Sequence, residues 1–195
     1  MSHYFDSNQA SASDRRTVEV MLHDVAFSYE TDRGVFSHGE LDSGTAVLLQ
    51  EAPPPPSHGV LVDLGCGAGP IALTLGLRSP EAHIVAVDTN DRARQLTATN
   101  ARRVNVDITT MHPDEVPDAL RVDLIWSNPP IRIGKTALHD MLQVWLDRLT
   151  EQGEAYLVVQ RHLGADSLHD WLTQHGWNVA RVSSRKGFRL LHVQR

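Results

Sequence analysis

Hydrophobic and polar residues alternate in the first part of the chain with the period of a β-strand. Apolar side chains occupy every second position from Val18 to Leu22 and again from Val25 to Tyr29, with His23-Asp24 between the two runs. Two alternating runs separated by a short polar break indicate an antiparallel hairpin over residues 17–29. Residues 1–15 are small and polar, so we expect a frayed terminus there.

The pattern next changes to that of a helix. Asp42 is a suitable N-cap residue for a helix over Ser43–Glu51, and the tetraproline run Pro53–Pro56 must end it. Four consecutive prolines form a short, stiff spacer. A polyproline ligand for a partner domain is the alternative, but the position beside a core strand favours a connector.

From residue 60 onward, short apolar runs alternate with segments of helical period. This alternation predicts an α/β fold, with a seven-stranded, mostly parallel sheet covered by helices on both faces. The closing pair of strands, joined through residues 185–187, adds an antiparallel strand to it. The predicted strands are Val60–Leu64, His83–Val87, Val104–Met111, Val122–Trp126, Glu154–Gln160, Trp177–Ser183 and Phe188–Val193, and the predicted helices are Pro70–Leu77, Asp91–Arg103, Thr136–Leu149 and Ala165–His175.

The length of 195 residues fits one domain over 1–195, with the hairpin and first helix in 16–52 and the core in 57–195. The net charge of −6 excludes a globally basic coat for nucleic acid. No run approaches the roughly 20 apolar residues of a membrane helix, and the start has no signal-peptide core, so we expect a cytoplasmic protein. The single cysteine and eleven scattered histidines, without HExxH or CxxC spacing, predict no metal site.

A glycine-rich turn follows the first predicted parallel strand, with Gly65, Gly67 and Gly69 at alternate positions. Glycines let the backbone turn sharply and approach a ligand closely, and the following helix offers unpaired N–H groups. Asp88 ends the next strand, 19 residues after Gly69. A carboxylate there can accept both hydroxyls of a ribose. The alternative is that Asp88 only caps the helix that starts near Asp91.

Two residues indicate which nucleotide binds. Pro70 occupies the place where a dinucleotide fingerprint has its third glycine, and Asp63 would repel a pyrophosphate. S-adenosylmethionine (SAM) carries an ammonium, a sulfonium and no phosphate, so it suits these residues better than NAD. The same residues oppose an NAD-dependent oxidoreductase.

The sequence Asn128-Pro129-Pro130 follows the fourth parallel strand, at the same edge as the glycine loop. Proline fixes its own backbone and restrains the residue before it. The Asn128 amide oxygen and the Pro129 carbonyl can therefore accept the two hydrogens of a planar exocyclic amine and aim its lone pair at the SAM methyl group. Alignment supplies most of such catalysis. The alternative is a structural Asn-Pro turn.

These motifs together resemble the class I SAM-dependent methyltransferases, which have a Rossmann-like fold. VDLGCGAGP, AVDTN and DLIWSNPPIRIGK, with GVFSHGELDSGTAVLL upstream and RKGFRLL downstream, are similar to the catalytic domain of small-subunit ribosomal RNA guanine-N2 methyltransferases. The resemblance extends from about His3 to Leu191. It implies SAM as cofactor and Asn128, Pro129 and Pro130 as the catalytic residues that hold the target amine. The cofactor-binding residues it implies are Phe36, Ser37, Thr45, Asp63, Gly65, Cys66, Gly67, Gly69, Asp88, Thr89 and Asp114.

The chain departs from the enzymes it resembles in two ways. Related enzymes often carry an additional N-terminal domain that helps bind RNA, and none is expected here. Ile131 follows the NPP motif where many relatives with this motif have an aromatic that stacks on the base, so Phe36 or Trp126 must stack instead, or stacking is weaker.

Local charge still favours an RNA partner. Arg132 and Lys135 follow the NPP motif, and the last 18 residues contain five basic residues and no acid: Arg181, Arg185, Lys186, Arg189 and Arg195. We expect Ile131, Arg132, Lys135, Arg185 and Lys186 to contact substrate, with the charges forming a phosphate-contacting rim. The alternative is a solvated basic edge.

The leading hypothesis is methylation of guanine N2 in ribosomal RNA. The alternatives are methylation of a protein amide or a small-molecule amine, and a SAM-binding module without catalysis.

Overall fold

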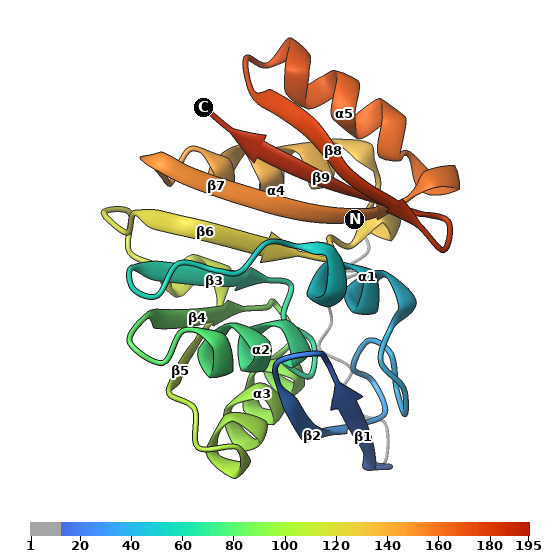
Figure 1. Cartoon of the computed structure of the whole chain (residues 1–195), viewed down its shortest axis with the longest axis vertical. Helices are drawn as coiled ribbons and strands as arrows, with labels where there is room; N and C mark the ends of the chain where they lie inside the picture. Colours follow the sequence, from blue (N-terminus) through green and yellow to red (C-terminus); the bar gives the residue numbers. More distant parts are fainter. Residues whose placement is uncertain (1–12) are drawn as a thin grey trace, which may run out of the picture.

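A computed structural model describes residues 13–195 and has a seven-stranded sheet at its centre (Figure 1). The strands lie in the order β5-β4-β3-β6-β7-β9-β8, and β9 is antiparallel to both neighbours while the other pairs are parallel. The predicted fold class is therefore confirmed. The sheet strands are β3 (Val60–Leu64), β4 (His83–Val87), β5 (Ile108–Met111), β6 (Val122–Ser127), β7 (Leu149–Gln160), β8 (Asn178–Arg185) and β9 (Phe188–Gln194).

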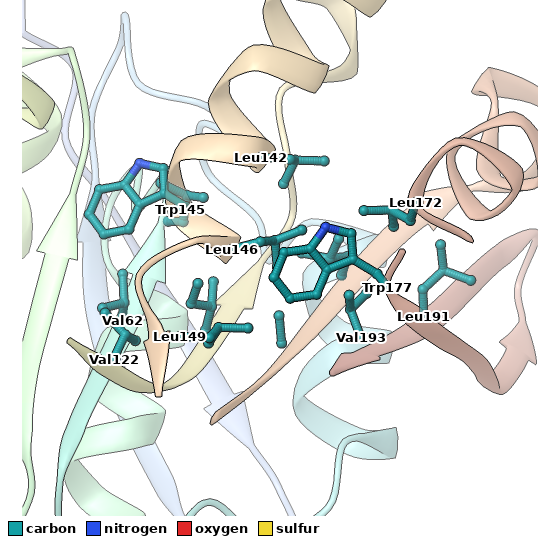
Figure 2. Packing of buried hydrophobic residues seen from close by; sticks show 14 of the residues in the cluster. Val62, Val122, Leu142, Trp145, Leu146, Leu149, Leu172, Trp177, Leu191 and Val193 are labelled. Atoms are coloured by element: carbon teal, nitrogen blue, oxygen red, sulfur yellow. The ribbon is translucent and has the colours of Figure 1, made fainter. Parts of the chain in front are cut away.

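The helices cover both faces of this sheet because its strands are apolar on both sides. Val62 and Leu64 of β3 pack with α4 and α5, whereas Leu61, on the opposite face of the strand, packs with α1 and α2. Figure 2 shows the first of these cores, where Trp145 and Trp177 lie over the sheet. The helices are α1 (Ser43–Glu51), α2 (Pro70–Arg78), α3 (Asp91–Arg103), α4 (Lys135–Leu146) and α5 (Ala165–Gln174). No helix within residues 13–195 has the length and apolar character needed to span a bilayer.

The predicted N-terminal hairpin forms a separate two-stranded sheet of β1 (Arg16–Met21) and β2 (Ala26–Thr31). Its buried side chains share a cluster with residues of α2 and α3. The Asn100 amide of α3 donates to the Glu30 carbonyl and accepts from the Glu30 N–H, both at 2.9 Å. The hairpin is thus fixed to the helices beside the glycine loop. Residues 1–12 of the expected frayed terminus lie outside the described residues.

Strand β5 is shorter than the predicted Val104–Met111, because the first residues of that segment end helix α3. Asn105 has a φ of +55°, its N–H donates to the Arg102 carbonyl, and the Val106 N–H donates to the Ala101 carbonyl. This is a Schellman motif with asparagine in the left-handed position. Apolar Val104 and Val106 therefore belong to a helix end, and their hydrophobicity made them look like strand residues.

The boundary between α4 and β7 also differs from the prediction of Thr136–Leu149 and Glu154–Gln160. Leu149 pairs with Val122, and Glu154 pairs with Leu124, so the residues between them form an irregularity at the start of β7. Gly153 lies there, and a Cβ atom on it would be 2.7 Å from the Val122 carbonyl oxygen. Leu149 is extended and pairs with β6, so α4 ends before it, at Leu146. Other predicted bounds agree to within two residues.

The strand order reverses direction between β3 and β6. The chain moves from β3 to β4 and β5 on one side, and from β6 to β7 on the other. In open α/β sheets, ligands bind outside the carboxyl ends of the strands at such a switch point. The glycine loop follows β3 and the NPP motif follows β6, so the topology brings the two motifs together.

Candidate functional site

The glycine loop turns over the tip of β4. The N–H groups of Gly65 and Cys66 both donate to the Val87 carbonyl, at 2.8 and 3.0 Å. Gly65, Gly67 and Gly69 all have positive φ, of +83°, +55° and +90°. At Gly69 the reason for glycine is also steric, since a Cβ atom there would lie 2.8 Å from a Thr97 methyl carbon of α3.

Asp63 lies beneath this loop and is fully buried. Its Oδ2 accepts a hydrogen bond of 2.9 Å from the Ala72 N–H in the first turn of α2, and its Oδ1 has no partner within residues 13–195. Burial, and then the negative charge of Asp88, raise the pKa of Asp63 to about 8. Asp63 therefore anchors the helix that follows the loop, and a positive charge near the loop would favour its ionised form.

Asp88 holds the loop from the neighbouring strand. Its Oδ2 accepts from the Gly67 N–H, and its Oδ1 accepts from the Asn90 N–H, both at 2.9 Å. Asn90, not Asp88, caps helix α3, because the Asn90 side chain accepts from Arg92 and Ala93. Each Asp88 oxygen keeps a further lone pair for a ligand hydroxyl. Helix capping therefore does not account for Asp88.

The segment after the hairpin forms the wall opposite the glycine loop. Val35 is buried, whereas Phe36 is 66% exposed, and Ser37 has a φ of +60°. The Asn90 amide donates to the Gly34 carbonyl at 2.9 Å and so ties this segment to the tip of β4. The segment leads into α1, which lies beside the carboxyl ends of β3 and β6 (Figure 1).

Asn128 joins the end of β6 to the start of α1. Its Nδ2 donates to Asp42 Oδ2 at 2.7 Å and to Thr45 Oγ1 at 3.1 Å. Ser127, one residue earlier, donates a buried hydrogen bond of 2.6 Å to the Leu64 carbonyl at the tip of β3. The two strand tips are thus connected directly, and Asn128 is held in one position.

The Pro129 carbonyl is less available to a target amine than the sequence predicted. The Pro129 carbonyl accepts a hydrogen bond of 2.8 Å from the Ile131 N–H and is therefore not entirely free for a target amine. A carbonyl has two lone pairs, so one remains. Pro130 is exposed, and Ile131 packs partly against the core beneath α4.

One pocket contains both strand tips. Seven of the fourteen residues expected from sequence to be catalytic or to bind the cofactor line it, but Asp63, Gly69, Asp88, Thr89, Asp114, Pro129 and Pro130 do not. Sequence reasoning missed Tyr29, for which alternation gave no functional signal, and Asp42, which it identified only as a cap. The lining residues are Tyr29, Phe36, Ser37, Asp42, Thr45, Gly65, Cys66, Gly67, Ala68, Pro70, Ile71 and Asn128.

Asp114 lies away from this pocket. It belongs to a short 3-10 turn, Pro113–Glu115, and its side chain is 89% exposed. Its N–H donates to His112 Nδ1, and its carboxylate lies 3.4 Å from the same nitrogen. Thr89 is also exposed. Neither residue lines the pocket. Among residues 13–195 there is also no group of three or more His, Cys, Asp or Glu side chains that could hold a metal ion.

In the fold, three of the five basic residues of the C-terminal stretch pair with two acids. Arg181 and Arg189 both pair with Asp166 of α5, and Arg185 pairs with Glu51 of α1. These acids are distant in sequence, so the absence of acids from the stretch itself was misleading. Lys186 stays exposed in the β8–β9 turn.

Arg132, Lys135 and Arg161 are exposed as well. Arg132 and Lys135 follow β6, Arg161 follows β7, and Lys186 follows β8, which runs parallel to β7. All four therefore belong to the carboxyl edge of the sheet. Within residues 13–195 none of the four makes an ion pair, in contrast to the arginines above.

Comparisons with known proteins agree with this geometry. Over 197 residues the chain is 29% identical to an uncharacterised protein of Bacillus subtilis, covering 99% of this chain and 98% of that protein. It is 33% identical over 149 residues to the ribosomal RNA small subunit methyltransferase C of Pseudoalteromonas translucida, covering 74% of this chain but 43% of that enzyme. The corresponding Hahella chejuensis enzyme is 34% identical, with 83% of this chain and 48% of that enzyme covered. The chain thus spans about half the length of these two enzymes.

Among solved structures, a T. thermophilus 16S rRNA N2 methyltransferase in complex with AdoMet and guanosine has the same fold. The TM-score is 0.77 at 21% identity, covering 93% of this chain and 50% of that one. The model of the methyltransferase small domain family matches residues 26–192. The chain therefore belongs to the methyltransferase small domain family.

Proposed function

We propose that this chain transfers a methyl group from SAM to the exocyclic amine N2 of guanine in ribosomal RNA. The single observation that carries the proposal is that Asn128 and the glycine loop line the same pocket. A hydrogen-bond acceptor for an amine thus lies at the place where a methyl donor would be bound. The relatives named as ribosomal RNA methyltransferases support the class of substrate.

The cofactor end of the pocket fits SAM. The exposed backbone of Gly65 and Gly67 would lie against the methionine part, with Cys66, Ser37 and Thr45 on the walls. Asp88 would accept the ribose hydroxyls, and the unpartnered oxygen of Asp63 would favour a nearby ammonium or sulfonium. Of the expected cofactor contacts, Asp114 has the least support, because its side chain points into solvent.

The chemistry requires alignment more than acid or base strength. When bound, SAM would supply a methyl group from its sulfonium: the amine nitrogen would bond to the methyl carbon as the C–S bond breaks, the sulfur would leave as a neutral thioether, and the methylated nitrogen would lose one proton to water. Asn128 would accept an N–H hydrogen of the amine through its Oδ1, and the second lone pair of the Pro129 carbonyl would accept the other. Pro129 and Pro130 restrict the backbone, so both acceptors are oriented before substrate arrives. Such alignment can contribute roughly 7–11 kcal/mol to lowering a barrier.

Burial decides between the two aromatic residues proposed to stack on the target base. Trp126 is fully buried and has no face available. Phe36 lines the pocket and is 66% exposed, whereas Tyr29, the other aromatic of the pocket, is 2% exposed. Phe36 is therefore the stacking residue of our proposal, in place of an aromatic at position 131.

The phosphate-contacting rim is redefined by the ion pairs. We assign it to Arg132, Lys135 and Lys186, with Arg161 added, and no longer to Arg185, whose guanidinium is occupied by Glu51. Ile131 lies between this rim and Asn128 in sequence, and its partial burial leaves only part of its side chain for substrate.

The decisive experiment identifies the methyl acceptor. Cell extract from a strain lacking the protein would be incubated with purified protein and SAM carrying a labelled methyl group, and ribosomal particles, RNA, protein and small molecules would then be separated. We expect label in small-subunit ribosomal RNA, released on digestion as N2-methylguanosine. Label in protein or in small molecules would establish one of the alternative amines, and SAM binding without label anywhere would establish a binding module.

A further inference from the structure

The carboxamide of Asn128 is held by residues that are distant from it in the sequence. Asp42, which accepts its 2.7 Å hydrogen bond, precedes it by 86 residues, and Thr45 lies one turn further along α1. All three residues line the pocket. The hydrogen bond to Asp42 has a charged acceptor, which makes it stronger than one between neutral groups.

These contacts determine which way round the amide lies. A carboxylate can only accept hydrogen bonds, so the amide nitrogen, not the oxygen, must face Asp42. The same Asp42 Oδ2 also accepts from the Thr45 N–H at 2.8 Å as the N-cap of α1, so the carboxylate itself is fixed. The Asn128 oxygen therefore occupies the other branch of the carboxamide, away from Asp42.

We propose that Asp42 is a positioning residue for methyl transfer: it selects the orientation of Asn128 in which an acceptor oxygen, not a donor NH2, meets the target amine. An amine donates hydrogens, so the reversed amide would place donor against donor. This inference rests on the proposed function, because it assumes that the acceptor group is an exocyclic amine. It gives a second role to Asp42, which the sequence indicated only as a helix cap.

Two substitutions separate positioning from capping. Asp42→Ser keeps a good N-cap residue, but its short side chain cannot reach Asn128. Asp42→Asn can place its amide oxygen where Oδ2 now lies and accept both hydrogen bonds, without the charge. Glu40→Ser removes a nearby exposed acid of the same segment and serves as a control.

We expect Asp42→Ser to bind SAM within about threefold of the wild type and to lose at least about tenfold in kcat, with little change in KM for RNA. Asp42→Asn should keep kcat within about threefold of the wild type, and Glu40→Ser should match the wild type. A wild-type kcat in Asp42→Ser would overturn the proposal. An equal loss in Asp42→Asn and Asp42→Ser would also overturn it, because charge would then matter and amide orientation would not.

A second measurement does not depend on methyl transfer. In the side-chain amide region of an NMR spectrum, the Asn128 NH2 group, assigned through Asn128→Asp, should show one proton shifted downfield and protected from exchange. Asp42→Ser should abolish both features, and Glu40→Ser should preserve them. An unchanged resonance in Asp42→Ser would contradict the orientation even in an inactive protein. If the resonance changes as expected while wild-type protein methylates no RNA, the proposed substrate is wrong and the orientation stands.

Discussion

The tips of β3 and β6 form one pocket by opposite means. At β3, three glycines have positive φ, the backbone of Gly65 and Gly67 lines the pocket, and the supporting carboxylates of Asp63 and Asp88 accept hydrogen bonds from backbone N–H groups. At β6, prolines restrict the backbone, and one side chain, Asn128, is oriented by residues of α1. In the proposed function, the cofactor end at β3 therefore depends on conformational freedom of the backbone, and the acceptor end, the part of the pocket around Asn128, depends on restriction of a side chain.

The two ends also differ in how far apart in the sequence their residues lie. Apart from Ser37 and Thr45 on its walls, the cofactor end is contained in residues 63–88, within one strand-helix-strand unit. The acceptor end requires contact between residues 86 positions apart. Substitutions at the two tips should accordingly separate SAM binding from methyl transfer.

Asn128→Ala should separate methyl transfer from SAM binding most strongly. Removing the oriented acceptor should lower kcat by about a hundredfold or more, because misalignment of a reacting group costs about this much. SAM affinity, measured by calorimetry, should stay within about threefold because the glycine loop is unchanged. Asn178→Ala, an exposed asparagine at the start of β8, is the control and should alter neither quantity. A full methylation rate in Asn128→Ala would eliminate the amine-binding mechanism.

At the other tip, Gly69→Ala should have the converse effect. Its left-handed backbone conformation is unfavourable for alanine by about 1–2 kcal/mol, and the new methyl group would in addition collide with Thr97. We expect lower stability in urea unfolding and SAM binding weakened by about tenfold, which corresponds to about 1.4 kcal/mol.

A matched control for Gly69→Ala is Gly176→Ala. Gly176 has a φ of +88°, but a Cβ atom there meets nothing within 4 Å. It should show the backbone cost alone and leave SAM affinity unchanged. If the two variants lose equal stability, close packing against α3 is not the reason for glycine at position 69.

The contrast between local signals and contacts of distant segments explains how much of the molecule could be predicted from its sequence. The bounds of β3, β4, α1 and α3 match the predictions fully, because apolar runs, glycines and caps are local signals. The role of Asn105 was missed, since a Schellman motif lies in backbone angles and the valines around it are typical of strands. The contacts of Asp42 with Asn128, and of Asp166 and Glu51 with the C-terminal arginines, join distant segments, so no local pattern could reveal them.

A smaller effect, confined to the acceptor end, is expected from Phe36→Ala. Stacking of a base on an aromatic ring contributes about 1–3 kcal/mol, so kcat/KM for RNA should fall by roughly tenfold. Phe36→Tyr should retain most of the activity, and Met21→Ala, which removes another exposed apolar side chain, should have no effect. If Phe36→Ala instead weakens SAM binding and leaves the KM for RNA unchanged, Phe36 belongs to the cofactor end.

Asp63 gives the cofactor end a pH dependence. Its pKa is raised to about 8 in the fold, so the folded protein binds more protons than the unfolded chain, and its contribution to stability falls as pH rises toward 8. Asp63→Asn cannot titrate. Because one pKa unit is worth about 1.4 kcal/mol, the stability of Asp63→Asn relative to wild type should increase by more than about 1 kcal/mol between pH 5 and pH 8. Urea unfolding without SAM measures this difference, and parallel pH profiles would place the Asp63 pKa outside this range.

The smallest effect concerns the rim around the acceptor end, where exposed and ion-paired basic residues can be compared directly. Arg132→Gln combined with Lys186→Gln should weaken RNA binding a few-fold at moderate salt, and it should reduce the slope of log K against log salt by about 0.7 for each single-strand phosphate that the protein no longer neutralises. Arg181→Gln removes a guanidinium that Asp166 holds in an ion pair and should leave the slope unchanged. Equal slopes in all three proteins would mean that the carboxyl edge does not contact phosphates. A reduced slope in Arg181→Gln alone would mean that RNA displaces the Asp166 pair, and the binding surface would then lie on α5 and β8 instead of around Asn128.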